Sequence, residues 1–429
     1  MAETARRDRV ALVLRAEAAG VRARLIGALR DFDRAEDALQ DALTAAWERW
    51  PVDGLPDRPA AWLYRVAERR ALDVLRREAV AARHAPQQAG EAAQAPEPEE
   101  LLALADFDDD LLRLIFTCCD PSLRPEIRAA LTLRTVLDMS LEEVARAFLV
   151  PPRTMEQRLL RARQRLQRSG IPWSVPTGAE LPARLNDVLR VAYLIFTEGY
   201  ATTSGESLTR PDLCALAIGL MRRLVRLQRG QAESLALLAL MLLQHARAAA
   251  RSDAAGLPVL LADQDRTRWD PGAIRQGTVL LEKALRLRQP PGPYQIQAAI
   301  AAVHANAPSA RDTDWQEISA LYDALCRVQD TPVVRLNRAV AIAMASGAAA
   351  GLAELDRLAA IPSLIGHHPY HTARGALLWR LERRDAAVAA YRRALGLTRN
   401  RAEAGFLQDR IERIEAGEAG PEVQLPERA

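Results

Sequence analysis

The chain has 429 residues, of which 49% are hydrophobic and 5% aromatic, and a formal net charge of +3. This length predicts several domains, and so small a net charge identifies no class of partner. Four cysteines without CxxC spacing argue against a disulfide scaffold or a zinc site. With no signal segment and no long apolar run, and with abundant Ala, Leu and Arg, we expect an all-α cytoplasmic protein that does not enter a membrane.

Helices are expected first over residues 8–50. Within residues 33–50, Ala35, Leu39, Ala42 and Ala46 repeat with the spacing of one helix face. Acidic side chains gather near the start of the same helix, where the helix dipole stabilises negative charge; these are Asp33, Glu36, Asp37 and Asp41. Stabilisation of the helix start is the alternative to a functional role for this cluster.

A helix over residues 60–77 follows a loop at residues 51–59 that is rich in Pro, Asp and Gly. Trp62 and Tyr64 lie near its start, and arginines follow them at positions 65, 69, 70, 76 and 77. Aromatic rings interleaved with arginine suit melted nucleic acid, whose bases stack and whose phosphates require cations. Trp62 is equally compatible with a place in the core.

Residues 81–100 are expected to form a flexible linker, because the sequence from about residue 78 is rich in Ala, Gln, Glu and Pro and has no apolar face. Helices that support the next segment are expected over residues 106–137. The adjacent Cys118 and Cys119 within them are expected to be buried as small hydrophobic side chains.

Two helices joined by a tight turn are predicted over residues 140–168. Ser140 and Glu143 have the spacing of a capping box. Pro151 and Pro152 should end the first helix, after which Thr154 can cap the second.

The second helix of this pair has an apolar face and a basic face. Met155, Leu159, Ala162 and Leu166 repeat along the apolar face, and arginines line the other. A DNA-reading helix-turn-helix has this construction: residues at the start of the second helix meet base edges and later ones meet phosphates. The candidates are Arg153, Thr154, Glu156, Gln157, Arg158, Arg161 and Arg165. A helical hairpin with a solvated basic face is the alternative.

A second linker, residues 169–182, precedes a helical region that extends to about residue 415. Within this region we expect helices over residues 185–196, 211–227, 232–251, 270–287, 295–305, 315–327, 333–345, 349–358, 372–383 and 385–397. Near its end, the sequences from Asn337 and from Arg374 align with a shift of 37 residues, as in a helical repeat. Polar and aromatic residues in this region form a candidate ligand or partner site or, alternatively, cap helices. The candidates are Glu198, Tyr200, Asp263, Gln264, Asp265, Arg266, Trp269 and Asp270, with Tyr294, Gln297, His304 and Trp315. No catalytic set, metal site or cofactor motif is recognised, so we expect no enzyme.

Three sequence blocks carry a resemblance to a known family. DRAEDALQDALTAAWERW, PAAWLYRVAERRALDVLRRE and the segment that ends in RARQRL resemble the extracytoplasmic-function group of bacterial RNA polymerase sigma factors. The resemblance implies sigma region 2 at residues 8–80, region 4 at residues 101–168, and a regulatory domain at residues 183–415 similar to tetratricopeptide repeats. It further implies promoter DNA and core polymerase as partners, the latter through its β′ clamp helices and β flap.

The same resemblance implies roles for individual residues. The polymerase-binding residues would be Asp33, Glu36, Asp37, Gln40 and Asp41. Those at the minus-ten element would be Asp53, Leu55, Trp62, Arg65, Arg69 and Arg70, and the minus-thirty-five element would be read by residues 153–165. A conventional helix-turn-helix regulator with a ligand-sensing or protein-sensing helical domain is the competing interpretation; it leaves the 60–77 helix and the acidic helix before it unexplained.

Overall fold

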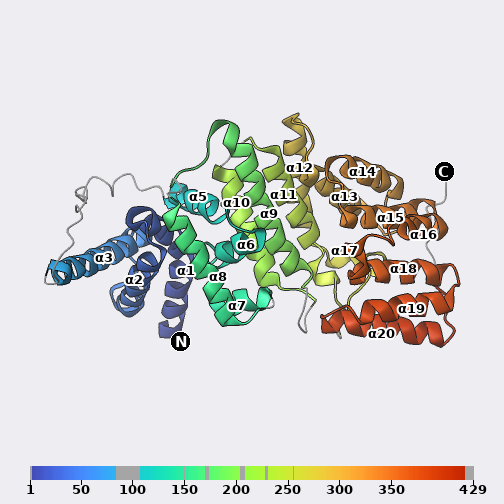
Figure 1. Cartoon of the computed structure of the whole chain (residues 1–429), viewed down its shortest axis with the longest axis horizontal. Helices are drawn as coiled ribbons and strands as arrows, with labels where there is room; N and C mark the ends of the chain where they lie inside the picture. The colour runs from blue at the N-terminus through green and yellow to red at the C-terminus, as the bar shows by residue number, and fades with distance from the viewer. Residues whose placement is uncertain are drawn as a thin grey trace. The chain divides into compact units, whose positions relative to one another are not determined.

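The computed structural model describes residues 2–83, 107–148, 150–169, 173–202, 208–227, 230–254 and 256–420. Those residues form helices and short 3-10 turns without a β-strand (Figure 1), which confirms the predicted all-α class. No helix among them is both long and apolar enough to cross a membrane. The chain divides into two compact units, Met1–Val191 and Ala192–Ala429, which are described separately.

The first unit begins with a bundle of three helices, α1 (Ala2–Leu29), α2 (Phe32–Asp53) and α3 (Pro59–Arg83). Asp31 caps α2 by accepting hydrogen bonds from the backbone of Asp33 and Arg34. The helix continues through Pro51 and ends at Gly54, whose φ of 88° suits glycine. Because α3 reaches Arg83, residues 78–83 are helical and not part of a linker. The remainder of the expected linker, residues 84–100, lies outside the described residues.

A second bundle of the first unit consists of α5 (Phe107–Cys118), α6 (Pro125–Thr135), α7 (Leu141–Ala147) and α8 (Pro152–Arg168). The capping box before α7 is confirmed: the Ser140 N–H donates to Glu143 Oε2 over 2.8 Å, and the Glu143 N–H donates to Ser140 Oγ over 3.2 Å. The prediction that Thr154 caps α8 was wrong. Pro152 occupies the first turn instead, where proline needs no N–H partner.

Helix α9 (Leu181–Tyr200) begins in the first unit and ends in the second. Its first half is attached to α5 and α6. Arg184 Nη2 donates to the Phe116 carbonyl over 2.7 Å, Arg184 also pairs with Asp120, and Asp187 pairs with Arg128 at 2.6 Å. The beginning of α9 is therefore part of the same folded body as the second bundle.

The second unit contains, besides the end of α9, helices that pack on their neighbours in chain order. They are α10 (Pro211–Leu227), α11 (Ala232–His245), α12 (Pro271–Arg286), α13 (Pro293–Asn306), α14 (Trp315–Val328), α15 (Pro332–Ser346), α16 (Ala348–Arg357), α17 (Pro362–Ile365), α18 (His368–Arg380), α19 (Arg384–Leu395) and α20 (Arg401–Glu415). The segments that align with a 37-residue shift fall on two helix pairs, α15 with α16 and α18 with α19.

The last six helices share one apolar core, and α18, α19 and α20 lie side by side in it (Figure 1). Trp379 is fully buried in this core. Gly351 of α16 lies so close to α15 that a Cβ there would come within 2.3 Å of the Ala343 side chain. Glycine at this position therefore permits the close approach of α16 to α15.

Two expectations for this region were wrong in detail. The helix expected over residues 232–251 ends at His245, because the Ala246 carbonyl accepts a hydrogen bond from the Asp270 N–H over 2.8 Å. Helices α17 and α20 were not expected. Helix α20 is capped by Asn400, whose side chain accepts from the Glu403 N–H, and its Leu407, Ile411 and Ile414 join the core.

Candidate functional site

Helix α8 has the two faces that its sequence predicts. Met155, Leu159, Ala162 and Leu166 are buried against the second bundle. The side chains of the candidate DNA-reading residues other than Thr154 are exposed, and Thr154 is half-buried. The structure thus leaves a basic helix face accessible and fixes its orientation through four buried side chains.

The predicted polymerase-binding residues on α2 do not share one environment. Asp33, Asp37, Gln40 and Asp41 are exposed, whereas Glu36 is half-buried. Gln40 Nε2 donates to Glu36 Oε1 over 3.1 Å. Asp37 and Asp41 line a cavity of about 80 Å³ together with Arg34 and Arg70. Solvent therefore reaches most of the acidic face, whereas Glu36 is partly covered by other residues.

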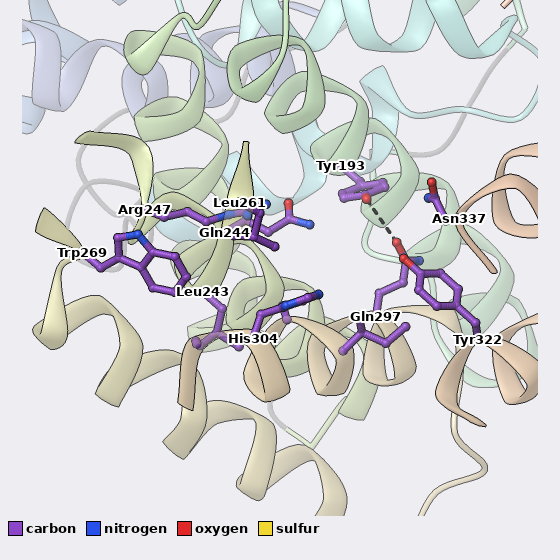
Figure 2. A pocket seen from close by; sticks show the side chains of 13 residues that line it. Tyr193, Leu243, Gln244, Arg247, Leu261, Trp269, Gln297, His304, Tyr322 and Asn337 are labelled. Carbon is purple, nitrogen blue, oxygen red and sulfur yellow. Dashed lines mark hydrogen bonds between the residues drawn. The ribbon is translucent and has the colours of Figure 1, made fainter. Parts of the chain in front are cut away.

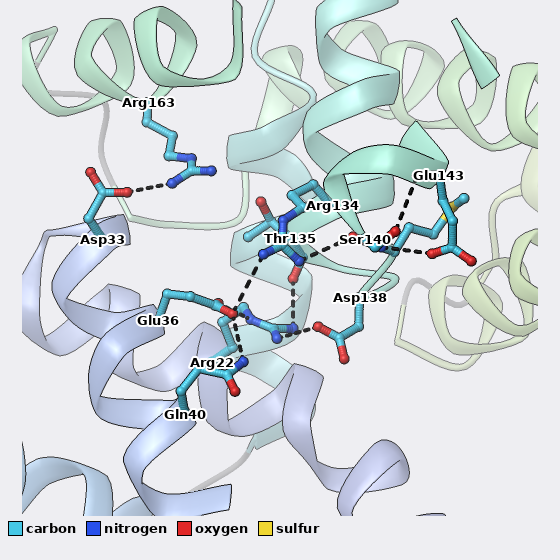
Figure 3. Close-up of polar contacts among 11 residues, drawn as sticks. Arg22, Asp33, Glu36, Gln40, Arg134, Thr135, Asp138, Ser140, Glu143 and Arg163 are labelled. Atoms are coloured by element: carbon cyan, nitrogen blue, oxygen red, sulfur yellow. Dashed lines mark hydrogen bonds and ion pairs between the residues drawn. The ribbon is translucent and has the colours of Figure 1, made fainter. Parts of the chain in front are cut away.

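Arg22 of α1 binds the Glu36 side chain of this acidic face (Figure 3). This arginine is 1% exposed. Its Nε donates to Glu36 Oε2 over 2.8 Å, its Nη1 to the Thr135 carbonyl over 3.2 Å, and its Nη2 to Asp138 Oδ1. One guanidinium thus joins the first bundle to the end of α6 and the turn after it.

The charges around Arg22 also set the protonation of Glu36. Burial by itself raises the pKa of this carboxyl. The charge of Arg22 and its hydrogen bond outweigh burial, with smaller contributions from Gln40 and Arg134, so the pKa of Glu36 lies below its ordinary value. Glu36 is therefore a carboxylate at neutral pH.

A second ion pair joins the two bundles. Arg163 of α8 pairs with Asp33 of α2 (Figure 3). Asp33 belongs to the predicted polymerase-binding face, and Arg163 belongs to the predicted DNA-reading helix. The two predicted surfaces therefore contact each other through these side chains.

The predicted minus-ten residues lie at the end of α2, the following loop and α3. Asp53, Arg65, Arg69 and Arg70 are exposed. Leu55 and Trp62 are half-buried, and Trp62 packs edge-on against Trp50 with ring centres 5.3 Å apart. The Trp62 ring thus has a structural contact as well as an accessible part, so both interpretations of this residue remain compatible with its position.

The cysteines expected in the core are confirmed there. Cys118 and Cys119 are 0% and 1% exposed and free of disulfide bonds. Burial raises the pKa of Cys119 to about 12, although a hydrogen bond with Thr132 lowers it. These thiols are protonated packing groups at neutral pH.

In the second unit, several candidate ligand residues cap helices instead. Asp265 accepts from the Thr267 N–H, and Asp270 accepts from the N–H groups of Gly272 and Ala273 at the start of α12. Arg266 donates to the carbonyls of His304 and Ala307, both over 2.6 Å, at the end of α13. The capping interpretation therefore applies to these residues.

Other candidates lie around cavities. Asp263, Asp265, Arg266 and Trp315 line an open cavity of about 780 Å³. Trp269, Gln297 and His304 line a smaller cavity of about 190 Å³, shown in Figure 2. Tyr200 lies outside both linings: it stacks on Phe196, and Arg251 lies over its ring at 3.6 Å. Glu198 also lies outside both.

Comparison with known proteins assigns the first unit. Residues 14–80 match the family model for sigma-70 region 2, and residues 114–166 match the model for sigma-70 region 4. The first unit thus carries regions 2 and 4 of a sigma-70 factor. Residues 184–285 of this sigma factor match a family of unknown function, DUF6596. An uncharacterized protein of Rhizobium meliloti (strain 1021) is 42% identical over 406 residues, which cover 91% of this chain and 92% of that protein.

Sequence reasoning missed some residues that organise these sites. Arg22 lies among alanines of α1, and its partners Glu36 and Asp138 are 14 and 116 positions away in the sigma factor. In the cavity of Figure 2, Arg247, Tyr193 and Tyr322 come from separate segments and belong to no motif. An isolated basic or aromatic residue gives no sequence signal that it will join two bundles or line a cavity.

Proposed function

We propose that this sigma factor belongs to the extracytoplasmic-function group and directs promoter-specific initiation by core RNA polymerase. The observation that carries the proposal is the exposed arginine face of α8, held by four buried side chains within the part of the chain that matches sigma region 4. Its mechanism is binding: the chain joins polymerase, places α8 on duplex DNA and stabilises melted DNA.

The proposed division of contacts follows the exposed residues. Arg153, Glu156 and Gln157 at the start of α8 are accessible for base edges, and Arg158, Arg161 and Arg165 for phosphates. On α3, the exposed Arg65, Arg69 and Arg70 supply positive charge for the phosphates of melted DNA. The basic residues that we assign to duplex DNA and those that we assign to melted DNA thus lie on separate helices.

Core polymerase is proposed to bind the acidic face of α2. Four of its five candidate residues are exposed, but Asp33 pairs with Arg163 and Glu36 with Arg22. Use of the whole face therefore requires that α8 and the end of α6 move away from α2. Separation of the bundles would also release α8 toward DNA.

The helical domain at residues 183–415 is proposed to modulate this activity. The correspondence between the 37-residue sequence shift and two successive helix pairs supports a likeness to tetratricopeptide repeats, whose stacked helices bind proteins or small molecules. Helix α9, whose first half bonds to α5 and α6, continues along the chain into this domain.

The test is transcription in vitro with core polymerase on the DNA upstream of the gene. The full chain is compared with chains that end at Ser169 and at Val191, the latter keeping the pairs of Arg184 and Asp187 with the second bundle. Promoter-specific transcripts from the full chain or from the chain ending at Val191 support the proposal. Absence of specific transcripts with every form, or specific DNA binding that needs no polymerase, would favour a conventional regulator.

A point variant tests the assignment of α8. Arg161→Ala should weaken binding of the polymerase complex to promoter DNA and reduce the slope of log affinity against log salt by about 1, as expected for one lost phosphate contact. Arg124→Ala removes an exposed arginine of the same bundle outside α8 and serves as the matched control. Equal slopes for Arg161→Ala and the unmodified chain would contradict the docking of α8.

A further inference from the structure

The cavity of Figure 2 is enclosed by segments that are distant in the sequence. Tyr193 comes from α9, Gln244 from α11, Gln297 and His304 from α13, and Asn337 from α15. Its volume of about 190 Å³ is roughly six times the volume that one water molecule takes up in the liquid. The space therefore suits a small metabolite better than a peptide segment.

Buried polar atoms in the lining lack partners. Nε1 of Trp269 and Nδ1 of His304 are inaccessible to solvent and form no hydrogen bond with the described residues. Buried polar groups in native proteins are nearly always hydrogen-bonded. Tyr193 Oη, by contrast, donates to Gln297 Oε1 over 3.1 Å, which orients both side chains at the cavity. The lining is thus polar, partly ordered and incompletely satisfied.

The charge of the lining is one-sided. Arg247 is half-buried, lies 5.6 Å from the ring centre of Tyr200, and forms no ion pair with a described residue. No aspartate or glutamate is among the residues that line the cavity. The neighbouring Arg266 is committed to the carbonyls at the end of α13. Within the part of the chain that the structure describes, Arg247 is therefore a cation without a counter-ion.

The positive charge near the cavity contributes to a lower pKa of His304. Burial, then the charges of Arg247 and Arg266, lower the pKa of His304 to about 4. The imidazole is neutral at pH 7, so Arg247 supplies the single full charge of the lining. A ligand that balances it carries one negative charge, whereas a phosphate monoester carries about −1.5 to −2.

We propose that this cavity binds a small polar monocarboxylate, such as a hydroxy or amino acid, whose carboxylate pairs with Arg247. A planar guanidinium matches a carboxylate with two parallel hydrogen bonds. The amides of Gln244, Gln297 and Asn337 and the phenols of Tyr193 and Tyr322 are available for the hydroxyl or amino groups of the ligand. Apolar side chains, among them Leu243 and Ile300, complete the lining.

Regulation by this ligand rests on the proposed sigma function, whereas the binding site does not. Tyr193 lies on α9, whose earlier residues Arg184 and Asp187 bond to α5 and α6. A ligand that contacts Tyr193 would therefore bind the same helix that is attached to region 4.

The test is a thermal-shift titration of the full chain with L-lactate, D-glycerate and L-serine, and with acetate and inorganic phosphate for comparison. At least one of the first three is expected to raise the melting temperature of the chain by 2 °C or more at roughly 100 times its Kd. Arg247→Gln should abolish the shift. Arg275→Gln, which removes an exposed arginine from α12, should leave it intact.

A second variant keeps the proposal testable if Arg247→Gln fails to fold. Gln244→Glu places a carboxylate in the cavity as a built-in counter-ion for Arg247, and should weaken binding of the probe at least tenfold. The proposal is overturned if no hydroxy or amino acid shifts the melting temperature, if phosphate alone does so, or if the shift survives both variants. Because neither polymerase nor DNA is present, these outcomes are independent of the transcription test.

Discussion

Arg22→Met should loosen the contact between the two bundles of the first unit. Methionine retains most of the length and apolar volume of the arginine stem while removing its charge and its donors. Among the described residues, Glu36 would then keep Arg134 at 4.0 Å as its one cationic partner, and the Thr135 carbonyl would lose the hydrogen bond from Arg22. The change therefore tests the effect of the guanidinium separately from the packing of the side chain against α1 and its neighbours.

The expected magnitude follows from the burial of the partners. Removing one member of a buried ion pair costs about 3 to 5 kcal/mol. The side chains of Glu36 and Asp138 are 26% and 47% exposed, and solvent screens such partly exposed carboxylates. We therefore expect a loss of about 2 to 4 kcal/mol in the free energy of local opening.

Hydrogen exchange measured by mass spectrometry reports that opening locally. Exchange of amides in α2 and α6 should accelerate by roughly 30-fold to 1000-fold, since each 1.4 kcal/mol is a factor of ten. Arg15→Met makes the same chemical change at an exposed position of α1 and should alter exchange less than twofold. Unchanged protection of both helices in Arg22→Met would refute the reasoning.

Three further predictions concern the stability of the chain. Ser140→Ala removes the cap of α7 and should cost about 1 kcal/mol, seen as faster exchange of its amides. Trp379→Ala should cost about 3 to 5 kcal/mol in urea unfolding of the second unit, because this side chain is fully buried. The depressed pKa of Glu36 contributes stability above its unfolded pKa of about 4.3, which is lost as pH falls through the lower folded value. Protection of α2 should thus be constant from pH 6 to 8, and acid unfolding followed by circular dichroism should shift to higher pH in Arg22→Met.

The sequence predicted correctly those features of the helices that depend on residues close together in the chain. The apolar repeat from Met155 to Leu166 identified the buried face of α8, and Ser140 with Glu143 identified the start of α7. Both signals depend on residues within a few helical turns. The start of α8 was misplaced because Thr154 and Pro152 are each competent near a helix start, and proline took the first turn.

The residues that sequence reasoning missed are defined by long-range packing. Arg22 becomes important only when folding brings Asp138 to it from 116 positions away. Similarly, Arg247, Tyr322 and Asn337 line one cavity only because folding brings together the end of α11, α14 and α15. Helix α20 lacked a strong sequence signal because its apolar residues are separated by many charged ones, and the buried core decides its position.

The pair formed by Arg163 and Asp33 has a thermodynamic consequence under the proposed function. While this ion pair is intact, Arg163 of the DNA-reading helix neutralises Asp33 of the polymerase-binding face, and neither charge is available to an external partner. A partner that binds either surface shifts the chain toward the separated form, and the second partner then binds a population that is already competent. The same coupling free energy acts in both directions. Polymerase would raise the affinity of the chain for promoter DNA, and promoter DNA would raise its affinity for polymerase by the same factor.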